Sequence, residues 1–358
     1  MSSNAWRGKR VFLTGHTGFK GSWLALWLAD LGAEVTGYSL PAPTDPSLFD
    51  QAQVGGVLKR DIRGDVRDLD ALRVAVAEAQ PEVVFHLAAQ PLVRYSYAEP
   101  VETYATNVMG TVHLLEACRA VSSIAAIVCI TSDKCYENRE WIWPYRENDP
   151  MGGYDPYSSS KGAAELVINA YRQSFFGKGP AVASVRAGNV IGGGDWAADR
   201  LVPDIVRALE AGQRPSIRSP ASVRPWQHVL EALGGYLMIA DRLLAGDRTA
   251  ATGWNFGPAD DDTRPVSWIV ERMLGEWGAS GWDRPVSEQP HEATLLTLDC
   301  SKARRELGWR PAMGLGQALA MVVDWHKSVA KGMSARDVTL TQLQDYRALQ
   351  AANLMELN

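Results

Sequence analysis

The sequence predicts an α/β protein whose core is a doubly wound parallel sheet, with a smaller second lobe toward the carboxyl end. Three observations support this prediction. Short apolar runs alternate with helical patterns through the first half of the chain, a glycine-rich turn joins the first run to a helix, and one later run is apolar at every position but one. A nearly continuous apolar run is typical of a strand that is buried on both faces of a parallel sheet.

Composition excludes several classes of protein. The chain has 358 residues, more than a usual single domain, and a net charge of −5, so we expect two lobes and no nucleic-acid partner. Met1–Lys9 is polar, and no run approaches the ~18 apolar residues of a membrane span, so we expect no membrane association and a cytoplasmic location. The four cysteines are scattered without a C-x-x-C pair, which favours reduced core residues and predicts no metal site.

The first strand, Val11–Thr14, leads into Gly15-His16-Thr17-Gly18-Phe19-Lys20-Gly21 and then into the helical pattern Trp23–Asp30. In a strand–turn–helix of this kind, Gly15 permits the tight turn, Gly18 lets the backbone approach a pyrophosphate, and Gly21 allows close helix packing. The segment therefore predicts a dinucleotide site.

The second strand is expected over Glu34–Tyr38, and the third over Leu58–Ile62, followed by a helix from Leu69. An acidic residue at the end of the second strand would mark NAD, and an arginine there would mark NADP. The chain has Ser39 and Leu40 instead. The residues themselves therefore leave the choice between the two cofactors open.

The apolar run Val83–Ala89 predicts the buried central strand, and we interpret His86 within it as a core residue. A helix over Pro100–Arg119, which carries Asn107, precedes a strand over Ala126–Ile130. That strand ends in the polar cluster Thr131-Ser132-Asp133-Lys134-Cys135-Tyr136. Ligands of such sheets bind beyond the carboxyl ends of the strands, so this cluster lies where chemistry is expected.

Tyr157 and Lys161 are four residues apart at the start of a predicted helix, and both side chains therefore lie on one face. An isolated phenol has a pKa near ~10 and is a poor base at neutral pH unless a nearby cation favours the phenolate. Lys161 is placed to supply that charge. The pair is weak evidence alone and gains its weight from the dinucleotide turn that precedes it.

The sixth strand is expected over Ala181–Arg186, and the glycines at 188–194 then lead the chain out of the sheet. An amphipathic segment opens at Leu201, and Gly253–Gly257 predicts a short strand that returns to the sheet edge. Terminal helices are expected over Ala318–Lys327 and Gln342–Leu354.

The glycine turn and the Tyr157–Lys161 pair together resemble the extended short-chain dehydrogenase/reductase family of nucleotide-sugar epimerases and dehydratases, over nearly the whole chain. The resemblance implies bound NAD, a Rossmann-type domain at 1–186 and a substrate-binding lobe at 187–358, with parts of about 224–260 returning to the first domain. It implies further cofactor contacts at Thr17, Phe19, Asp65, Val66, Leu87, Ala88, Ala89, Thr131, Tyr157 and Lys161. A helix cap is an equally good interpretation of the Gly64–Asp68 element.

The second lobe contains residues that resemble the substrate-binding residues of the family. Arg224-Pro225-Trp226-Gln227-His228-Val229 is similar to the family's Arg-x-Trp-x-x-Val element, whose arginine binds the substrate diphosphate. The resemblance implies substrate contacts at Asn189, Leu201, Val202, Arg218 and Arg224. A solvated basic loop is the alternative for the two arginines.

The triplet Ser132-Asp133-Lys134 occupies the place where the family's nucleotide-sugar 4,6-dehydratases carry Thr-Asp-Glu. In those enzymes the aspartate is the acid and the glutamate the base of a water elimination. Lys134 is either the base here, which requires a lowered pKa, or it orients a water or stabilises an enolate. The likeness implies CDP-glucose as the substrate. The alternatives are a related epimerase or reductase and a catalytically silent NAD-binding sensor.

A homodimer is expected from the helices Pro100–Arg119 and Tyr157–Phe176, which carry apolar residues on more than one face. The family pairs through these two helices. The candidates for the interface are Val108, Val112, Leu115, Leu166 and Ile168.

Overall fold

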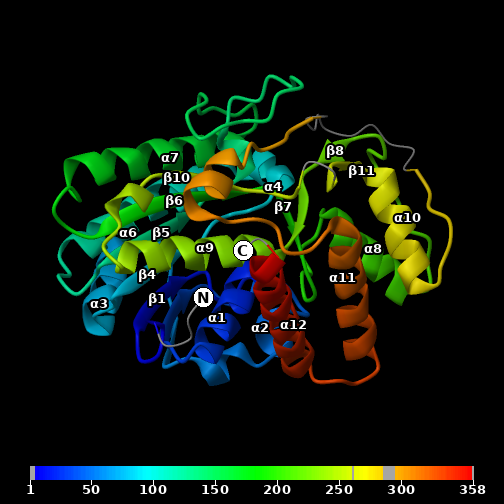
Figure 1. Ribbon diagram of the computed structural model, residues 1–358, viewed down its shortest axis with the longest axis horizontal. Helices are drawn as coiled ribbons and strands as arrows, with labels where there is room; N and C mark the ends of the chain where they lie inside the picture. Colours follow the sequence, from blue (N-terminus) through cyan, green and yellow to red (C-terminus); the bar gives the residue numbers. More distant parts are fainter. Residues whose placement is uncertain (1–4, 260–261, 285–294, 357–358) are drawn as a thin grey trace.

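The computed structural model describes residues 5–259, 262–284 and 295–356, and its centre is a seven-stranded sheet (Figure 1). The strands are β1 (Arg10–Thr14), β2 (Glu34–Ser39), β3 (Arg60–Arg63), β4 (Val83–His86), β5 (Ala126–Ile130), β6 (Ala181–Ala187) and β10 (Gly253–Phe256). Their order is β10-β6-β5-β4-β1-β2-β3, and every pairing is parallel. The predicted fold class is confirmed. The strand order reverses between β1 and β4, where sheets of this type bind their ligands.

Helices cover both faces of the sheet (Figure 1). On one face lie α3 (Leu69–Ala79), α6 (Gly110–Arg119) and α7 (Pro156–Ser174), and on the other lie α1 (Phe19–Asp30) and α9 (Val229–Leu244). The last helix, α12 (Ala335–Glu356), packs on α1 as an additional outer element. Three short helices complete this part: α2 (Leu48–Gln51), α4 (Val93–Ala98) and α5 (Pro100–Tyr104).

A smaller group of elements lies beyond the carboxyl ends of the strands, on the right of Figure 1. It contains α8 (Leu201–Glu210), α10 (Val266–Trp277), α11 (Leu315–Ala330) and two small sheets. The small sheets pair β7 (Asn189–Ile191) with β9 (Trp226–His228) and β8 (Val223–Arg224) with β11 (Arg264–Pro265). Between these elements the chain returns to the main sheet, since β10 pairs with β6 at its edge. The strand predicted over Gly253–Gly257 is thereby confirmed.

Several predicted boundaries differ from the structure. The third strand begins at Arg60 rather than Leu58, the first helix begins at Phe19 rather than Trp23, and β4 ends at His86 rather than Ala89. Helices α9 and α10 were not predicted. The helix expected over Pro100–Arg119 contains a π turn, η3 (Ala105–Met109), around Asn107. Single π turns inside α-helices are often found near functional sites.

The core is built as the sequence indicates. His86 is buried, with Nδ1 2.8 Å from Thr14 Oγ1 and Nε2 3.2 Å from Thr111 Oγ1, which confirms it as a satisfied core residue. The four cysteines are free and buried, also as predicted. Among the described residues, none of the helices combines the length and apolar character needed to cross a bilayer.

The residues proposed for a dimer interface separate into two groups. Leu115 and Ile168 have no exposed surface, because both face the sheet, so their assignment to an interface was wrong. Leu166 is 61% exposed, and Val108 and Val112 are partly exposed. The position of a residue around the helix axis decides this difference.

Candidate active site

The glycine turn has the shape of a phosphate cradle. Gly15 has φ +75°, and a Cβ there would lie 2.6 Å from the backbone nitrogen of Ala88. A Cβ on Gly21 would lie 2.0 Å from the carbonyl oxygen of Gly15, whereas one on Gly18 would meet nothing closer than 3.5 Å. The turn ends at the amino terminus of α1, whose first turn contains no acidic residue. Unpaired backbone N–H groups there suit a dinucleotide pyrophosphate.

The end of β2 has polar but no acidic side chains. Thr17 Oγ1 lies 2.8 Å from Ser39 Oγ and donates to the carbonyl oxygen of Leu40 at 3.0 Å. The carboxylate of Asp61, on the neighbouring strand β3, lies 2.8 Å from Nε2 of His16. Burial lowers the pKa of His16 although Asp61 opposes this shift.

The Gly64–Asp68 element is divided between two tasks. Asp68 caps α3 by accepting a hydrogen bond from Ala71 N at 3.0 Å, so the helix-cap interpretation of this element is confirmed, with Asp68 as the capping residue. The Asp65 carboxylate accepts hydrogen bonds from Nε and the backbone nitrogen of Arg67, both at 2.8 Å. Val66 is buried. Their contact with adenine stays a prediction.

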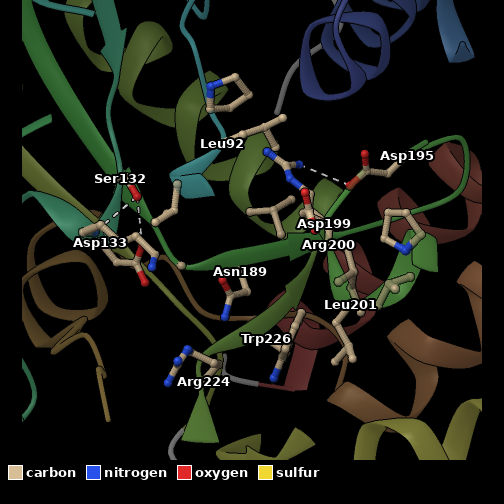
Figure 2. Close-up of a pocket in the computed structure, with 18 of the residues that line it drawn as sticks. Leu92, Ser132, Asp133, Asn189, Asp195, Asp199, Arg200, Leu201, Arg224 and Trp226 are labelled. Carbon is tan, nitrogen blue, oxygen red and sulfur yellow. Dashed lines mark hydrogen bonds and ion pairs between the residues drawn. The ribbon is translucent and has the colours of Figure 1, made fainter. Parts of the chain in front are cut away.

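A pocket of about 300 Å³ lies beyond the carboxyl ends of the central strands and brings most of the predicted residues together (Figure 2). From the cofactor and catalytic sets it is lined by Phe19, Leu87, Ala89, Thr131, Ser132, Asp133, Lys134, Tyr157 and Lys161. From the substrate set it is lined by Asn189, Leu201, Val202, Arg218 and Arg224. Its lining does not include Gly15, Thr17, Gly18, Gly21, Asp65, Val66 or Ala88.

Helix α7 positions Tyr157 and Lys161. Asp155 caps the helix by accepting from Ser158 N at 2.9 Å, and the backbone nitrogen of Tyr157 donates to Ser96 Oγ at 3.1 Å. The Lys161 ammonium lies 6.0 Å from the centre of the Tyr157 ring. Burial raises the pKa of Tyr157 to about 12 and lowers the pKa of Lys161 to about 8. Burial of Tyr157 therefore opposes the phenolate that the sequence leads us to expect.

Asp133 lies in the same pocket and is buried. Its Oδ1 accepts a hydrogen bond from Ser132 Oγ at 2.9 Å. Burial raises the pKa of Asp133, and the neighbouring Lys134 ammonium and Ser132 offset this only in part. A carboxyl group with a raised pKa holds its proton more readily, as a general acid must. The partly buried Lys134 side chain lines the pocket beside it, while its backbone nitrogen donates to Ser132 Oγ at 3.2 Å.

The sequence analysis did not identify a buried ion pair that joins α7 to β6. Glu165 accepts two hydrogen bonds from Arg186, from Nε at 2.9 Å and from Nη2 at 2.8 Å, and others from Thr131 Oγ1 at 2.5 Å and Ser184 Oγ at 2.7 Å. The two charged side chains are 4% and 5% exposed. The Glu165 carboxylate also opposes the fall in the Lys161 pKa. A signal existed, because Glu165 follows Lys161 by four residues on the same helix face.

Basic residues gather at the substrate end of the pocket. Arg224 is only 9% exposed, so a solvated loop is the wrong interpretation for it. Arg218 forms an ion pair with Asp199 at 3.0 Å, and Arg94 approaches the same carboxylate at 3.4 Å. Figure 2 shows Arg200 beside Asp195, whose carboxylate lies 3.2 Å away.

Asn107, expected on the active-site helix, does not line the pocket but organises the segments around it. Its side chain accepts from Gln90 N at 2.8 Å and donates to Gln90 O at 3.0 Å and to Ser160 Oγ at 2.9 Å. It therefore joins the segment after β4 to α7.

Comparisons with known proteins agree with this geometry. Residues 12–322 match the family model described as GDP-mannose 4,6 dehydratase. The chain is 56% identical over 353 residues to a CDP-glucose 4,6-dehydratase of Salmonella typhimurium, covering 97% of this chain and 98% of that protein. Among solved structures, it is similar to the dTDP-glucose 4,6-dehydratase DesIV of Streptomyces venezuelae with NAD bound, at 25% identity and a TM-score of 0.78, covering 89% of this chain and 97% of that chain. It is also similar to MoeE5 in complex with UDP-glucose and NAD, at 26% identity and a TM-score of 0.75, covering 90% and 100%.

Proposed function

The chain belongs to the nucleotide-sugar dehydratase family that the GDP-mannose 4,6 dehydratase model describes, and we propose that it is an NAD-dependent CDP-glucose 4,6-dehydratase. The product is CDP-4-keto-6-deoxy-glucose. The observation that carries the proposal is the 56% identity to a CDP-glucose 4,6-dehydratase over 97% of the chain. The pocket adds chemical support, because an epimerase needs no acid besides Tyr157 and Lys161, whereas a dehydratase does, and Asp133 lies beside them.

The first part of the reaction belongs to Tyr157, which takes the proton of the sugar 4-hydroxyl. NAD, when bound between the glycine turn and Tyr157, would supply an acceptor for the C4 hydride that could be given back at C6, so the overall reaction would have no net oxidation. Because burial raises the pKa of Tyr157 to about 12, its deprotonation at neutral pH requires positive charge close to the phenol. The Glu165 carboxylate, which accepts from Arg186, opposes the fall in the pKa of Lys161 and so favours its ammonium form.

The second part is the elimination of water from C5 and C6. The 4-ketone makes the C5 proton acidic, and Asp133, protonated more readily because it is buried, donates a proton to the departing C6 hydroxyl. Lys134 is the candidate acceptor of the C5 proton, since it lines the pocket beside Asp133. Ser132 orients the Asp133 carboxyl through its 2.9 Å hydrogen bond.

The diphosphate and the nucleoside are assigned to the opposite end of the pocket. Arg224 and Arg218 are suited to the diphosphate, since guanidinium groups bind phosphate oxygens in pairs. Asn189, Leu201 and Val202 line the same end and complete the proposed nucleotide site.

We also infer that the active protein is a cytoplasmic homodimer. Apolar side chains remain exposed on the two helical segments expected at the interface: Val101 of α5 is 81% exposed and Leu166 of α7 is 61% exposed. The four free cysteines suit a reducing compartment. Sedimentation of wild type and of Leu166→Glu tests this inference. If the dimer forms through these helices, the substitution should lower the sedimenting mass from that of a dimer toward that of a monomer.

The activity is tested by incubating the purified chain with CDP-glucose and measuring the alkali-induced absorbance of a 4-keto-6-deoxy sugar. Parallel incubations with UDP-glucose, dTDP-glucose and GDP-mannose measure base selectivity. Formation of a C4-epimeric CDP-sugar without this absorbance would assign the chain to the epimerases instead.

A further inference from the structure

Asp199 is a carboxylate of the pocket lining to which the proposed function assigns no task. It lies beside Arg200 on the segment that leads into α8 (Figure 2). Its Oδ1 lies 3.0 Å from Nη1 of Arg218 and 3.4 Å from Nη1 of Arg94. Arg94 belongs to α4, which follows β4 of the main sheet, whereas Arg218 precedes β8 of the smaller group of elements. One carboxylate therefore contacts arginines from both parts of the fold.

Two neighbouring aspartates of the lining pair mainly with residues that are close in the sequence. Asp195 pairs with Arg200 at 3.2 Å, five residues later, and Asp204 pairs with Arg207, three residues later on the same helix. The two arginine partners of Asp199 are 19 and 105 residues away. The contacts of Asp199 therefore depend on how the two parts of the fold meet, and an anion bound between those parts would change them first.

The ion pairs of Asp199 are open to solvent. The side chains of Arg94, Arg218 and Asp199 are 32%, 23% and 47% exposed, and water weakens ion pairs of this kind. A second carboxylate, Asp204, approaches Arg218 only at 3.8 Å. The diphosphate of a nucleotide sugar carries two negative charges and several acceptor oxygens, which guanidinium groups bind in pairs. It is therefore a stronger partner for the two arginines than the Asp199 carboxylate.

We propose that Asp199 competes with the substrate diphosphate for Arg94 and Arg218, and that Arg94 is a further diphosphate-binding residue. The inference rests on the proposed function, in which Arg218 binds the diphosphate of a nucleotide sugar. A diphosphate that takes both guanidinium groups joins α4 to the segment before β8 and displaces the carboxylate that contacts them. Asp199 thereby lowers the affinity of the pocket for the charged part of the substrate.

The backbone of Asp199 takes part in the same contacts. Its φ is +60°, a left-handed conformation in which aspartate and asparagine are found more often than other side chains. Nη2 of Arg218 donates to the carbonyl oxygen of Asp199 at 3.1 Å, so one arginine contacts both the side chain and the backbone of this residue. Movement of Arg218 toward a diphosphate would break both contacts. Those contacts lie just before Leu201 and Val202, which line the nucleotide end of the pocket.

The test measures binding to the full chain by calorimetry, with two probes that do not react. CDP has the diphosphate, and cytidine lacks it. Asp199→Asn removes the charge but keeps the size of the side chain and a residue that tolerates the left-handed backbone. It should lower the Kd of CDP about fivefold, which corresponds to the loss of one exposed ion pair, and leave the Kd of cytidine unchanged. Arg94→Gln should raise the Kd of CDP and likewise leave that of cytidine unchanged.

Combining the two substitutions tests the competition itself. With Asp199→Asn present, no Asp199 charge competes for Arg94, so Arg94→Gln should raise the Kd of CDP about tenfold. In wild type the same substitution also removes the competing ion pair, and the Kd should rise only about two- to threefold. Arg73→Gln is the matched control, because its 3.3 Å ion pair with Asp70 lies on α3 and neither residue lines the pocket; it should bind CDP like wild type.

Equal effects of Arg94→Gln in the two backgrounds would overturn the competition, because charges that act only at long range give additive effects. A raised Kd of CDP in Asp199→Asn would overturn it as well and make Asp199 a residue that orients the arginines. No effect of Arg94→Gln on CDP in either background would refute the role of Arg94 and leave the proposed function intact. If wild type binds UDP, dTDP or GDP but not CDP, the proposed substrate is wrong, and the same comparison with that nucleotide decides the inference. Absence of binding of all four would remove both.

Discussion

Replacing Glu165 by Gln tests whether the buried ion pair beneath α7 supports the catalytic helix. The substitution keeps the size and much of the hydrogen bonding of the side chain but removes its charge. Arg186, whose side chain is 5% exposed, would then be a buried cation without a counter-ion. Removing one partner of such a pair costs about 3–5 kcal/mol of unfolding free energy. For a chain of 358 residues this corresponds to a fall of about 4–7 °C in Tm.

The pH dependence of this loss follows from the pKa of Glu165. Burial raises that pKa, but the Arg186 charge and the hydrogen bonds from Arg186, Thr131 and Ser184 outweigh burial and lower it overall. A carboxylate whose folded-state pKa is lowered stabilises the fold above its unfolded pKa, about 4.3, and loses this contribution as the pH falls through the folded value. The difference between wild type and Glu165→Gln should therefore be complete at neutral pH and shrink below about pH 4.3.

Thermal unfolding followed by circular dichroism, repeated across this pH range, measures the effect. Glu78→Gln is the matched control, because its ion pair with Arg60 at 2.9 Å joins two exposed side chains. Exposed pairs contribute about 0–1 kcal/mol, so the control should lower Tm by no more than about 1 °C. The reasoning is refuted if Glu165→Gln melts like the control, or if its difference from wild type grows in acid.

Three further predictions concern the active site. Tyr157→Phe should slow C4 oxidation by at least about 10²-fold, while NAD affinity stays close to that of wild type because only the phenolic oxygen is lost. Stopped-flow detection of reduced nicotinamide at wild-type amplitude in this variant would contradict the prediction. Lys134→Ala should still form the 4-ketone but stall there, with slowed exchange of the C5 hydrogen for solvent deuterium, and Lys134→Glu should recover part of the elimination. Exchange at the wild-type rate in Lys134→Ala would rule out Lys134 as the base. A raised KM with oxidation and elimination lost alike would instead indicate that Lys134 anchors the substrate or cofactor. Gly21→Ala should abolish NAD binding, because the new Cβ would lie 2.0 Å from a carbonyl oxygen of the turn, whereas the Cβ of Gly18→Ala would have its nearest atom at 3.5 Å and should leave the turn folded. Calorimetric titration of both variants with NAD compares their affinities. Equal losses of NAD affinity in the two variants would argue against the steric explanation.

Much of the fold could be predicted because its signals are local. The burial of β4 follows from a run of apolar residues, and the cradle at Gly15–Gly21 follows from glycine spacing between a strand and a helix. Tyr157 and Lys161 could be placed together because helix geometry relates residues four positions apart. The predicted boundaries were less accurate, since α1 begins at Phe19 rather than at Trp23. Helix α9 was not predicted, although it covers one face of the sheet. The long apolar run of α9 lacks the clear alternation of an amphipathic helix, because most of that helix is buried.

The sequence by itself therefore determined the order of the main elements, the parallel sheet, the glycine turn and the placement of Tyr157 and Lys161 on one helix face. Only the tertiary structure decided which groups face one another. It pairs Glu165 with Arg186 and Asp199 with Arg218, and it turns Leu115 toward the core instead of an interface. The physical reason is that such contacts join residues distant in the sequence. They depend on how each helix is rotated against the sheet and on where the segment before α8 returns to the pocket, and no local pattern specifies either.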